Sequence, residues 1–221
     1  MGICEYMRDV ALKQGISVFG VADIKNVKQG FLLSQEVVAP LDFAISIGYR
    51  LSRAVLDTLT DGPNQLYYFH YQRVNILLDT VALQVSSIIQ SKGYMSLPIP
   101  ASQVVDWENQ RGHLSHRAIA VMAGHGFIGI NNLLVHPEYG SQTRFATILT
   151  NIPLKPATGE KSVCACSGCM KCIAVCPAGA IGKTHEEFSP ALCAAKLEEF
   201  QKTRNISQMI CGLCVKACQG A

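Results

Sequence analysis

The chain has few charged residues and no strongly basic or acidic segment. Asp, Glu, Lys and Arg make up only 16% of its 221 residues, whereas 49% are hydrophobic. This composition excludes global disorder and allows a substantial core. The formal net charge is +3, and Lys and Arg do not form a run. The sequence therefore gives little reason to expect a nucleic-acid partner.

Targeting segments are also lacking. No stretch of 18 or more consecutive apolar residues occurs, which argues against a membrane-spanning helix. The first residues, MGICEYMRDVALKQG, carry acidic side chains and no apolar core of a secretory signal. Tyr6 stands where N-myristoylation requires Ser or Thr. We therefore expect a cytoplasmic protein with no membrane partner.

Cysteine is scarce in the first 160 residues and concentrated near the end. Eight of the ten cysteines lie between residues 166 and 218. Disulfides would explain such a number in a small secreted protein, but clustering in a reducing compartment indicates metal binding. Of the other two, Cys4 is expected to be a buried structural thiol, and Cys164 lies too close to Cys166 to share its motif.

The cysteine spacing predicts two iron–sulfur clusters. Residues 166–177, CSGCMKCIAVCP, follow the C-x2-C-x2-C-x3-C-P run of bacterial ferredoxins, whose fourth cysteine binds the other cluster. A second group, CGLCVKAC, repeats the last three positions. Gln208 stands where its first cysteine would fall, and Cys193 is the available substitute. Zinc would also explain sets of four cysteines, but not this run. Crossing the ligands gives Cys166, Cys169, Cys172 and Cys218 to one [4Fe–4S] cluster, and Cys176, Cys193, Cys211 and Cys214 to the other.

Apolar periodicity outlines the remaining elements. It predicts a helix over residues 3–13, strands over 17–23 and 43–49, and a long helix within 70–94. A short helix over 116–123 is bounded by Ser115 and Gly124, and residues 131–154 read as two strands joined around PEYG. The long helix is expected to bury one stripe, formed by Val74, Leu77, Val81, Val85 and Ile88. We predict an α+β domain over residues 1–160 and a ferredoxin-like module over 161–221.

The sequence resembles one known family. The string AGHGFIGINNLLVHPEYGSQTRFATILTNIPL, followed by the cysteine run, is similar to the epoxyqueuosine reductases. Those proteins carry AGLGWIGKNxLL, a PEYGS-like turn, a strand ending in LTDLPL and the same two-cluster tail. GISVFGVA, AISIGYRL and the YYFHYQ helix resemble earlier parts of that family. The broader group includes the cobalamin-binding core of reductive dehalogenases.

The resemblance implies a nitroreductase-like α+β core that binds cobalamin next to one cluster. Electrons from an external ferredoxin or flavodoxin would then pass through both clusters to the corrinoid, for reduction of an unidentified substrate or of the corrinoid itself. By the same resemblance Asp106 is the candidate catalytic acid, and His70 matches a family histidine. His113, His116 and His125 are alternative proton donors or ligands. Gly124, Gly126 and Gly129 would let the backbone approach a large planar ring.

Departures from the family keep other functions open. The chain ends after the cysteines, where the family continues into a helical-repeat domain. His125 and Ile130 replace a Leu and a basic residue. These differences argue against tRNA as the substrate. One alternative is an electron-transfer or docking protein with clusters and no corrinoid. Another is a flavin-dependent reductase, because nitroreductase-like folds commonly hold flavin. A homodimer is expected only by analogy.

Overall fold

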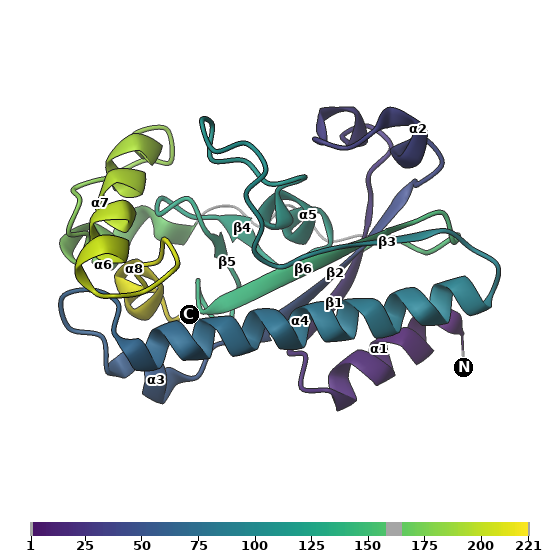
Figure 1. Ribbon diagram of the computed structural model, residues 1–221, viewed down its shortest axis with the longest axis horizontal. Helices are drawn as coiled ribbons and strands as arrows, with labels where there is room; N and C mark the ends of the chain where they lie inside the picture. Colours follow the sequence, from purple (N-terminus) through teal and green to yellow (C-terminus); the bar gives the residue numbers. More distant parts are fainter. Residues whose placement is uncertain (1, 158–164, 221) are drawn as a thin grey trace. The chain divides into compact units, whose positions relative to one another are not determined.

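The computed structural model combines helices with an antiparallel β-sheet, which confirms the predicted α+β class (Figure 1). It describes residues 2–157 and 165–220. In chain order the elements are α1 (Ile3–Lys13), β1 (Val18–Asp23), η1 (Lys28–Gly30), α2 (Gln35–Val38), β2 (Phe43–Arg50), α3 (Arg53–Asp57), α4 (Gln65–Ser91), β3 (Ser96–Ile99), α5 (His116–Met122), β4 (Phe127–Ile128), β5 (Leu134–Val135), β6 (Thr143–Thr150), η2 (Ala165–Gly168), α6 (Lys171–Ala174), α7 (Pro190–Thr203) and α8 (Leu213–Ala217).

The chain divides into two discontinuous units. The first takes in residues 1–49, 75–125 and 144–161, and the second takes in 50–74, 126–143 and 162–221. The sequence predicted one linear division after residue 160. The cysteine-rich tail instead shares its unit with two segments from earlier in the chain. The predicted linker KPATGEK lies largely outside the described residues, and Cys164 lies wholly outside them.

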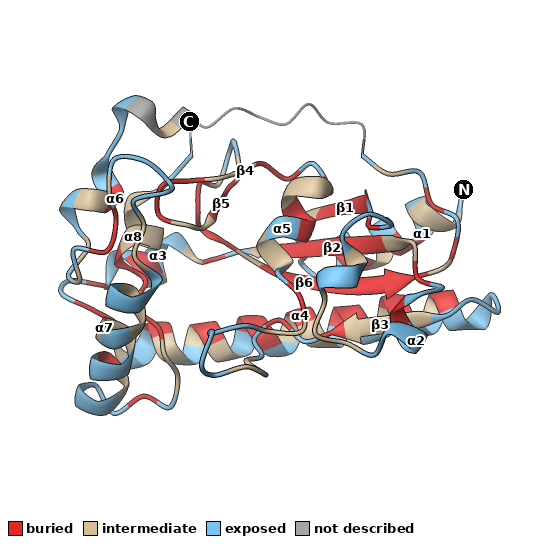
Figure 2. Ribbon diagram, turned by 90° about the horizontal axis from the view of Figure 1, so that it is seen from above, coloured by how far each residue is buried: buried red, intermediate tan, exposed pale blue. Residues whose placement is uncertain are grey.

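The first unit is built on a four-stranded sheet in the order β1-β2-β6-β3. β1 pairs antiparallel with β2, placing Val18 opposite Gly48, and β3 pairs antiparallel with β6. Figure 2 shows β1, β2 and β6 as largely buried. α5 packs closely on β1 at Gly20, where an added Cβ would collide with the carbonyl oxygen of Ala123. A close approach of helix and strand therefore requires glycine there.

The two strands predicted around PEYG are both present, as β5 and β6. The strands on either side of PEYG do not form a hairpin with each other. β5 pairs with β4 in a separate two-stranded ribbon, whereas β6 enters the large sheet between β2 and β3. The turn itself is closed by a bridge between His136 and Gly140. Adjacent apolar segments in the sequence predicted strands correctly but did not identify their partners.

The long helix α4 is present, but its buried stripe is shifted at two positions. Val74, Val81 and Val85 are buried as predicted, whereas Leu78 and Ile89 are buried in place of Leu77 and Ile88. Each exchange is between neighbouring apolar residues, so periodicity alone could not choose between them. The chain leaves the helix through Gly93, whose φ of +80° lies in the left-handed region that favours glycine.

The length and composition of α4 bear on the expectation about membrane-spanning helices. By length and composition this 27-residue helix could cross a bilayer, although no uninterrupted apolar run marks it in the sequence. The core helix of a soluble protein passes the same test, and 44% of its most apolar window is buried inside the protein. Length and composition are therefore weak evidence for a span.

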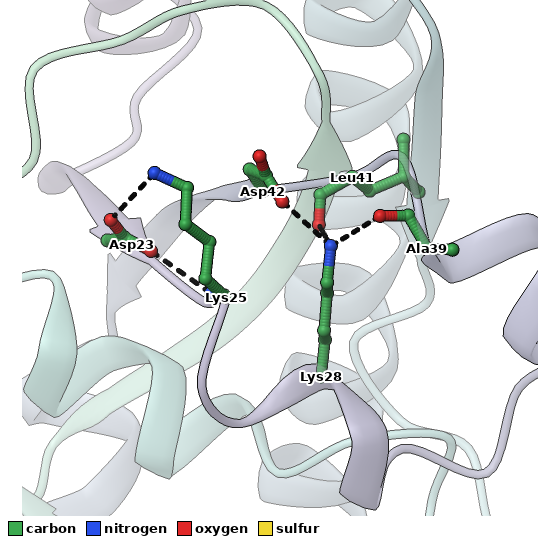
Figure 3. Close-up of polar contacts among 6 residues, drawn as sticks. All are labelled: Asp23, Lys25, Lys28, Ala39, Leu41 and Asp42. Atoms are coloured by element: carbon green, nitrogen blue, oxygen red, sulfur yellow. Dashed lines mark hydrogen bonds and ion pairs between the residues drawn. The ribbon is translucent and has the colours of Figure 1, made fainter.

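In the segment between β1 and β2, the side chain of Lys28 connects η1 to the residues that follow α2 (Figure 3). Lys28 Nζ lies 2.7 Å from Asp42 Oδ1 and donates to the carbonyl oxygens of Ala39 and Leu41. Its side chain is only 13% exposed, whereas the neighbouring pair of Lys25 and Asp23 is roughly half exposed. Lys28 thus satisfies acceptors just after α2 that would otherwise lose their partner.

Replacing Lys28 should therefore destabilise the protein. We expect Lys28→Ala to lower the free energy of unfolding by about 1–3 kcal/mol, because the part-buried acceptors at Leu41 and Asp42 are left without this donor. Lys25→Ala, the matched control at an exposed pair, should change it by less than about 1 kcal/mol. Urea unfolding followed by circular dichroism measures both. Equal effects would show that Lys28 contributes no more than a surface ion pair.

Candidate metal centre

Two short helices of the second unit carry the central cysteines. α6 contains Cys172 and is followed by Cys176, and α8 contains Cys214 and is followed by Cys218. The two helices contact each other (Figure 1). α8 begins after Gly212, whose φ is +90° and where an added Cβ would lie 2.7–2.8 Å from side-chain atoms of Leu59 and Tyr67. Only glycine allows this approach.

The thiols face an apolar interior. Cys172 is buried together with Ile130 and Ile181. Other members of the same cluster are partly buried, namely Cys166, Ile173, Cys176, Phe188 and Cys214. Among the eight predicted ligands only Cys169 is exposed. Such surroundings exclude water from thiol sulfurs, which favours a bound cluster over free, solvated thiolates.

Burial dominates the electrostatics of the thiols. Burial, followed by the charge of Cys176, raises the pKa of Cys193. Burial also raises the pKa of Cys211 to about 11, opposed by a backbone hydrogen bond from Leu213 and with smaller contributions from Cys193 and Cys176. The pKa of Cys214 is raised by burial and then by the charges of Cys211, Cys193, Cys176 and Cys172. Cys214 is thus coupled to cysteines of both predicted sets.

A thiol predicted for the first cluster shows a similar effect. Burial raises the pKa of Cys172, and the charges of Cys218 and Cys169 raise it further. The sulfur of Cys166 lies 3.5 Å from the position of a Cβ added at Gly129. The carbonyl oxygen of Cys218 accepts a hydrogen bond from the Ser141 amide.

The described thiols do not form a preformed site for a single ion. Zn–S bonds of about 2.3 Å would place the sulfurs of a tetrahedral site roughly 3.8 Å apart. Among the described residues, no three His, Cys, Asp or Glu side chains are gathered tightly enough to hold one ion. Metal binding would deprotonate the thiols, which reverses the effect of burial.

Backbone conformation or close contacts within the protein explain why glycine occupies each of the three positions predicted to face a cofactor. Gly124 has a φ of +81° after α5. A Cβ at Gly126 would collide with the carbonyl oxygen of Val135, and one at Gly129 would meet Val135 and Asn131. These contacts explain glycine without a cofactor. Of the three, Gly129 lies against a predicted cluster ligand.

The candidate histidines are occupied by structural hydrogen bonds. His70 Nε2 accepts the backbone N–H of Ser52 at 3.1 Å, just before α3, and burial lowers its pKa. His113 Nδ1 lies 2.8 Å from the carbonyl oxygen of Leu32. His125 is buried, stacks on Phe145 and has Nε2 3.3 Å from the Ser46 carbonyl oxygen.

His116 is held at both ring nitrogens. Nδ1 lies 2.8 Å from Thr147 Oγ1, and Nε2 lies 2.8 Å from the carbonyl oxygen of Pro100. Burial lowers its pKa to about 4. A neutral ring that bridges β6 and the segment after β3 accounts for this histidine as part of the first unit's structure.

Asp106 is a partly exposed loop carboxylate. Its two oxygens accept hydrogen bonds from the Asn109 amide, at 3.0 Å, and from Asn109 Nδ2, at 2.9 Å. These bonds lower its pKa. The loop is closed by a backbone bridge to Arg111, whose side chain donates to the Gly30 carbonyl oxygen. In this conformation Asp106 is ionised near neutral pH and does not supply a proton.

The sequence analysis missed the apolar residues around the thiols. Ile130 was interpreted only as the loss of a basic family residue. The structure buries it against Cys172 and beside Cys166. Ile181 and Phe188 were not singled out, although apolar residues shortly after the first cysteine run were a usable signal. Cys4, predicted to be buried, is half-buried.

Curated relatives match one part of the chain. A match to epoxyqueuosine reductase of Listeria monocytogenes is 36% identical over 88 residues, covering 40% of this chain and 22% of that protein. A match to the same enzyme of Bacillus subtilis is 43% identical over 70 residues, covering 32% of this chain and 18% of that protein. Part of this chain is homologous to the epoxyqueuosine reductases. No protein-family model matches it.

The epoxyqueuosine reductase homology is accompanied by a second, related similarity. A tetrachloroethene reductive dehalogenase of Desulfitobacterium hafniense is 32% identical over 98 residues, covering 42% of this chain and 18% of that protein. Both kinds of relative are oxidoreductases by name. The matched segments span only about a fifth of these curated relatives.

Solved structures share the fold over nearly the whole chain. A reductive dehalogenase, described as suggesting a mechanism for B12-dependent dehalogenation, has a TM-score of 0.74 at 16% identity. It covers 97% of this chain, which spans 31% of it. Epoxyqueuosine reductase from Streptococcus thermophilus has a TM-score of 0.62 at 18% identity, with 99% of this chain and 66% of that chain covered. An epoxyqueuosine reductase from Bacillus subtilis, solved with its catalytic aspartate loop swung out of the active site, scores 0.59 at 19% identity, covering 97% and 64%.

The assignment of Cys193 can be tested by metal content. We expect Cys193→Ala to lose one cluster, so that iron falls from about eight to about four per chain after anaerobic reconstitution. Cys4→Ala is the matched control and should retain about eight. Iron and acid-labile sulfide are counted on the same samples. A Cys193→Ala protein with full iron would remove Cys193 from the ligand set.

The state of His116 can be tested by pH. Its folded pKa of about 4 lies below the ordinary value of about 6.5, so the unfolded chain binds the proton first as pH falls. The neutral ring of His116 makes its full contribution to the free energy of unfolding above about pH 6.5, and this contribution is lost as pH falls towards 4. Between pH 7.5 and 5, wild type should lose about 2 kcal/mol more unfolding free energy than His116→Gln, measured by urea titration. Equal losses would mean that His116 protonates freely in the folded protein.

Proposed function

We propose that this chain is an iron–sulfur oxidoreductase that passes electrons through two [4Fe–4S] clusters to a corrinoid. The observation that carries the proposal is the packing of cysteines from both sequence motifs in one apolar cluster. Cys166, Cys172 and Cys176 of the first motif lie there with Cys214 of the second. Sharing of ligands between the two motifs is the pattern of two-cluster ferredoxins.

The chain's own residues supply binding and shielding. Cys166, Cys169, Cys172 and Cys218 would hold one cluster, and Cys176, Cys193, Cys211 and Cys214 the other. When bound, such clusters supply one-electron transfer at potentials set by charge, hydrogen bonds and solvent exposure. The apolar neighbours of the thiols keep water away, and the amide of Ala180, 3.4 Å from Cys176 Sγ, donates to a ligand sulfur.

The finer fold assignment is part of the same proposal. The first unit would be the nitroreductase-like core, and the part from residue 161 onward would be the ferredoxin-like module. Each of the helices α6 and α8 carries a cysteine that is followed, after three intervening residues, by a second cysteine beyond the end of the helix, and this repeat supports the second assignment. The similarity in fold to reductive dehalogenase and epoxyqueuosine reductase structures supports the first.

The corrinoid proposal is supported by the relatives and not by a binding site observed in this chain. One relative is described as acting in B12-dependent dehalogenation, and the match to it covers almost all of this chain. The glycines that the resemblance assigned to the ring are explained by contacts with protein atoms. For Asp106 to act as the proton donor, its carboxyl would have to leave Asn109. A swung-out catalytic loop in one solved relative gives a precedent for such movement.

Substrate and partners are inferred from chemistry. We propose a cytoplasmic protein that receives electrons from a ferredoxin or flavodoxin. The loss of a basic residue at Ile130 and the low net charge of +3 make tRNA, which one solved relative binds as a stem loop, an unexpected substrate here. A homodimer is also proposed only by analogy with nitroreductase-like folds.

Titration with cob(II)alamin tests the corrinoid directly. The anaerobically reconstituted protein should shift the cobalt EPR signal to a base-off form at about one equivalent of cobalamin. The reason is that binding to the protein would detach the cofactor's own lower base from cobalt. An unperturbed signal in a protein with full iron content would contradict the corrinoid and leave an electron carrier. Flavin absorbance in the purified protein would instead support the flavin-dependent reductase.

A further inference from the structure

We propose that a pocket on the outer side of α6 and α8 is the docking face for a small acidic electron-carrier protein. This inference rests on the proposed function, since it locates where electrons enter the clusters. The pocket has a volume of about 490 Å³ and lies wholly within the second unit. Its lining comes from α6, α8 and the loop after α3: Leu59, Thr60, Lys171, Ala174, Val175, Leu213, Lys216, Ala217 and Gln219.

The pocket lies next to the cluster ligands along the chain. Lys171 precedes Cys172, Val175 precedes Cys176, Leu213 precedes Cys214, and Ala217 and Gln219 flank Cys218. Two of these four cysteines belong to each predicted cluster. A carrier bound at the pocket would therefore contact residues that are direct sequence neighbours of ligands of both predicted clusters. None of the eight cysteines lines the pocket itself.

Charge favours an acidic occupant. The lining contains two lysines and no carboxylate. Lys216 Nζ lies 2.7 Å from the Leu59 carbonyl oxygen and 3.3 Å from that of Asp57, which fixes this ammonium group at the pocket. Lys171 is exposed. Two positive groups with no nearby acid in the lining attract a negatively charged protein and speed its encounter.

Small side chains complete the surface. Ala174 and Ala217 add little bulk, and Val175 is 39% exposed. Between the lysines they form an apolar floor that a partner side chain can contact closely. A positive rim with an apolar centre is the usual anatomy of a transient protein interface. In the step itself, the reduced carrier loses one electron and the cluster gains it, without bond formation or proton transfer.

The test measures cluster reduction by a defined acidic carrier. Reconstituted protein is mixed anaerobically with reduced bacterial flavodoxin, and bleaching of the cluster absorbance is followed by stopped flow. We expect Lys171→Glu and Ala174→Glu each to lower the second-order rate constant about tenfold at low ionic strength. The wild-type rate should fall as salt is added, and the rates of the two variants should depend less on salt. Ala174→Glu changes the pocket without altering a neighbour of a cysteine.

Lys92→Glu is the matched control, because it reverses the charge of an exposed lysine outside the pocket. It should keep the wild-type rate. Photoreduction with a deazaflavin should reduce the clusters equally in all four proteins. Wild-type rates in both pocket variants, with full iron and normal photoreduction, would overturn the docking face alone. A wild-type chain that binds no iron would instead overturn the proposed function.

Discussion

The second unit depends on the burial of several thiols in one apolar interior. Desolvation is the largest cause of the raised pKa of Cys172, Cys193, Cys211 and Cys214. Without metal these groups remain protonated and behave as small apolar side chains. Iron would displace their protons and supply positive charge where the protein supplies none, so cluster binding and the stability of this unit are linked. The same linkage explains why apolar residues such as Ile130 surround the ligands.

That constraint also explains why the second unit is discontinuous. The tail alone offers short helices that cannot bury a core. Residues 50–74 and 126–143 provide the missing contacts. Leu59 and Tyr67 pack against Gly212, and Ser141 holds the carbonyl of Cys218. Gln142 Nε2 likewise donates to the Lys216 carbonyl oxygen. Elements from the middle of the chain thus position α8 and the thiols that it carries.

Local features could be predicted from the sequence, and long-range ones could not. The bounds of α1, the cap at Ser115 and the turn at Gly93 follow from side-chain chemistry within a few residues. The strands on either side of PEYG were predicted, but their partners were not, because β6 pairs in the large sheet with strands far away in the sequence. Cysteine spacing predicts two ligand groups because cluster geometry constrains it, and this assignment stays a prediction. Nothing local to His116 or His70 indicated that each would be engaged by the backbone of a distant segment.

The most direct test of the account is Mössbauer spectroscopy of wild-type protein reconstituted anaerobically with ⁵⁷Fe and sulfide. We predict about eight irons per chain, all with the parameters of oxidised [4Fe–4S] clusters. About four irons, or zinc bound in preference to iron, would contradict the crossed two-cluster assignment on which the proposed function depends.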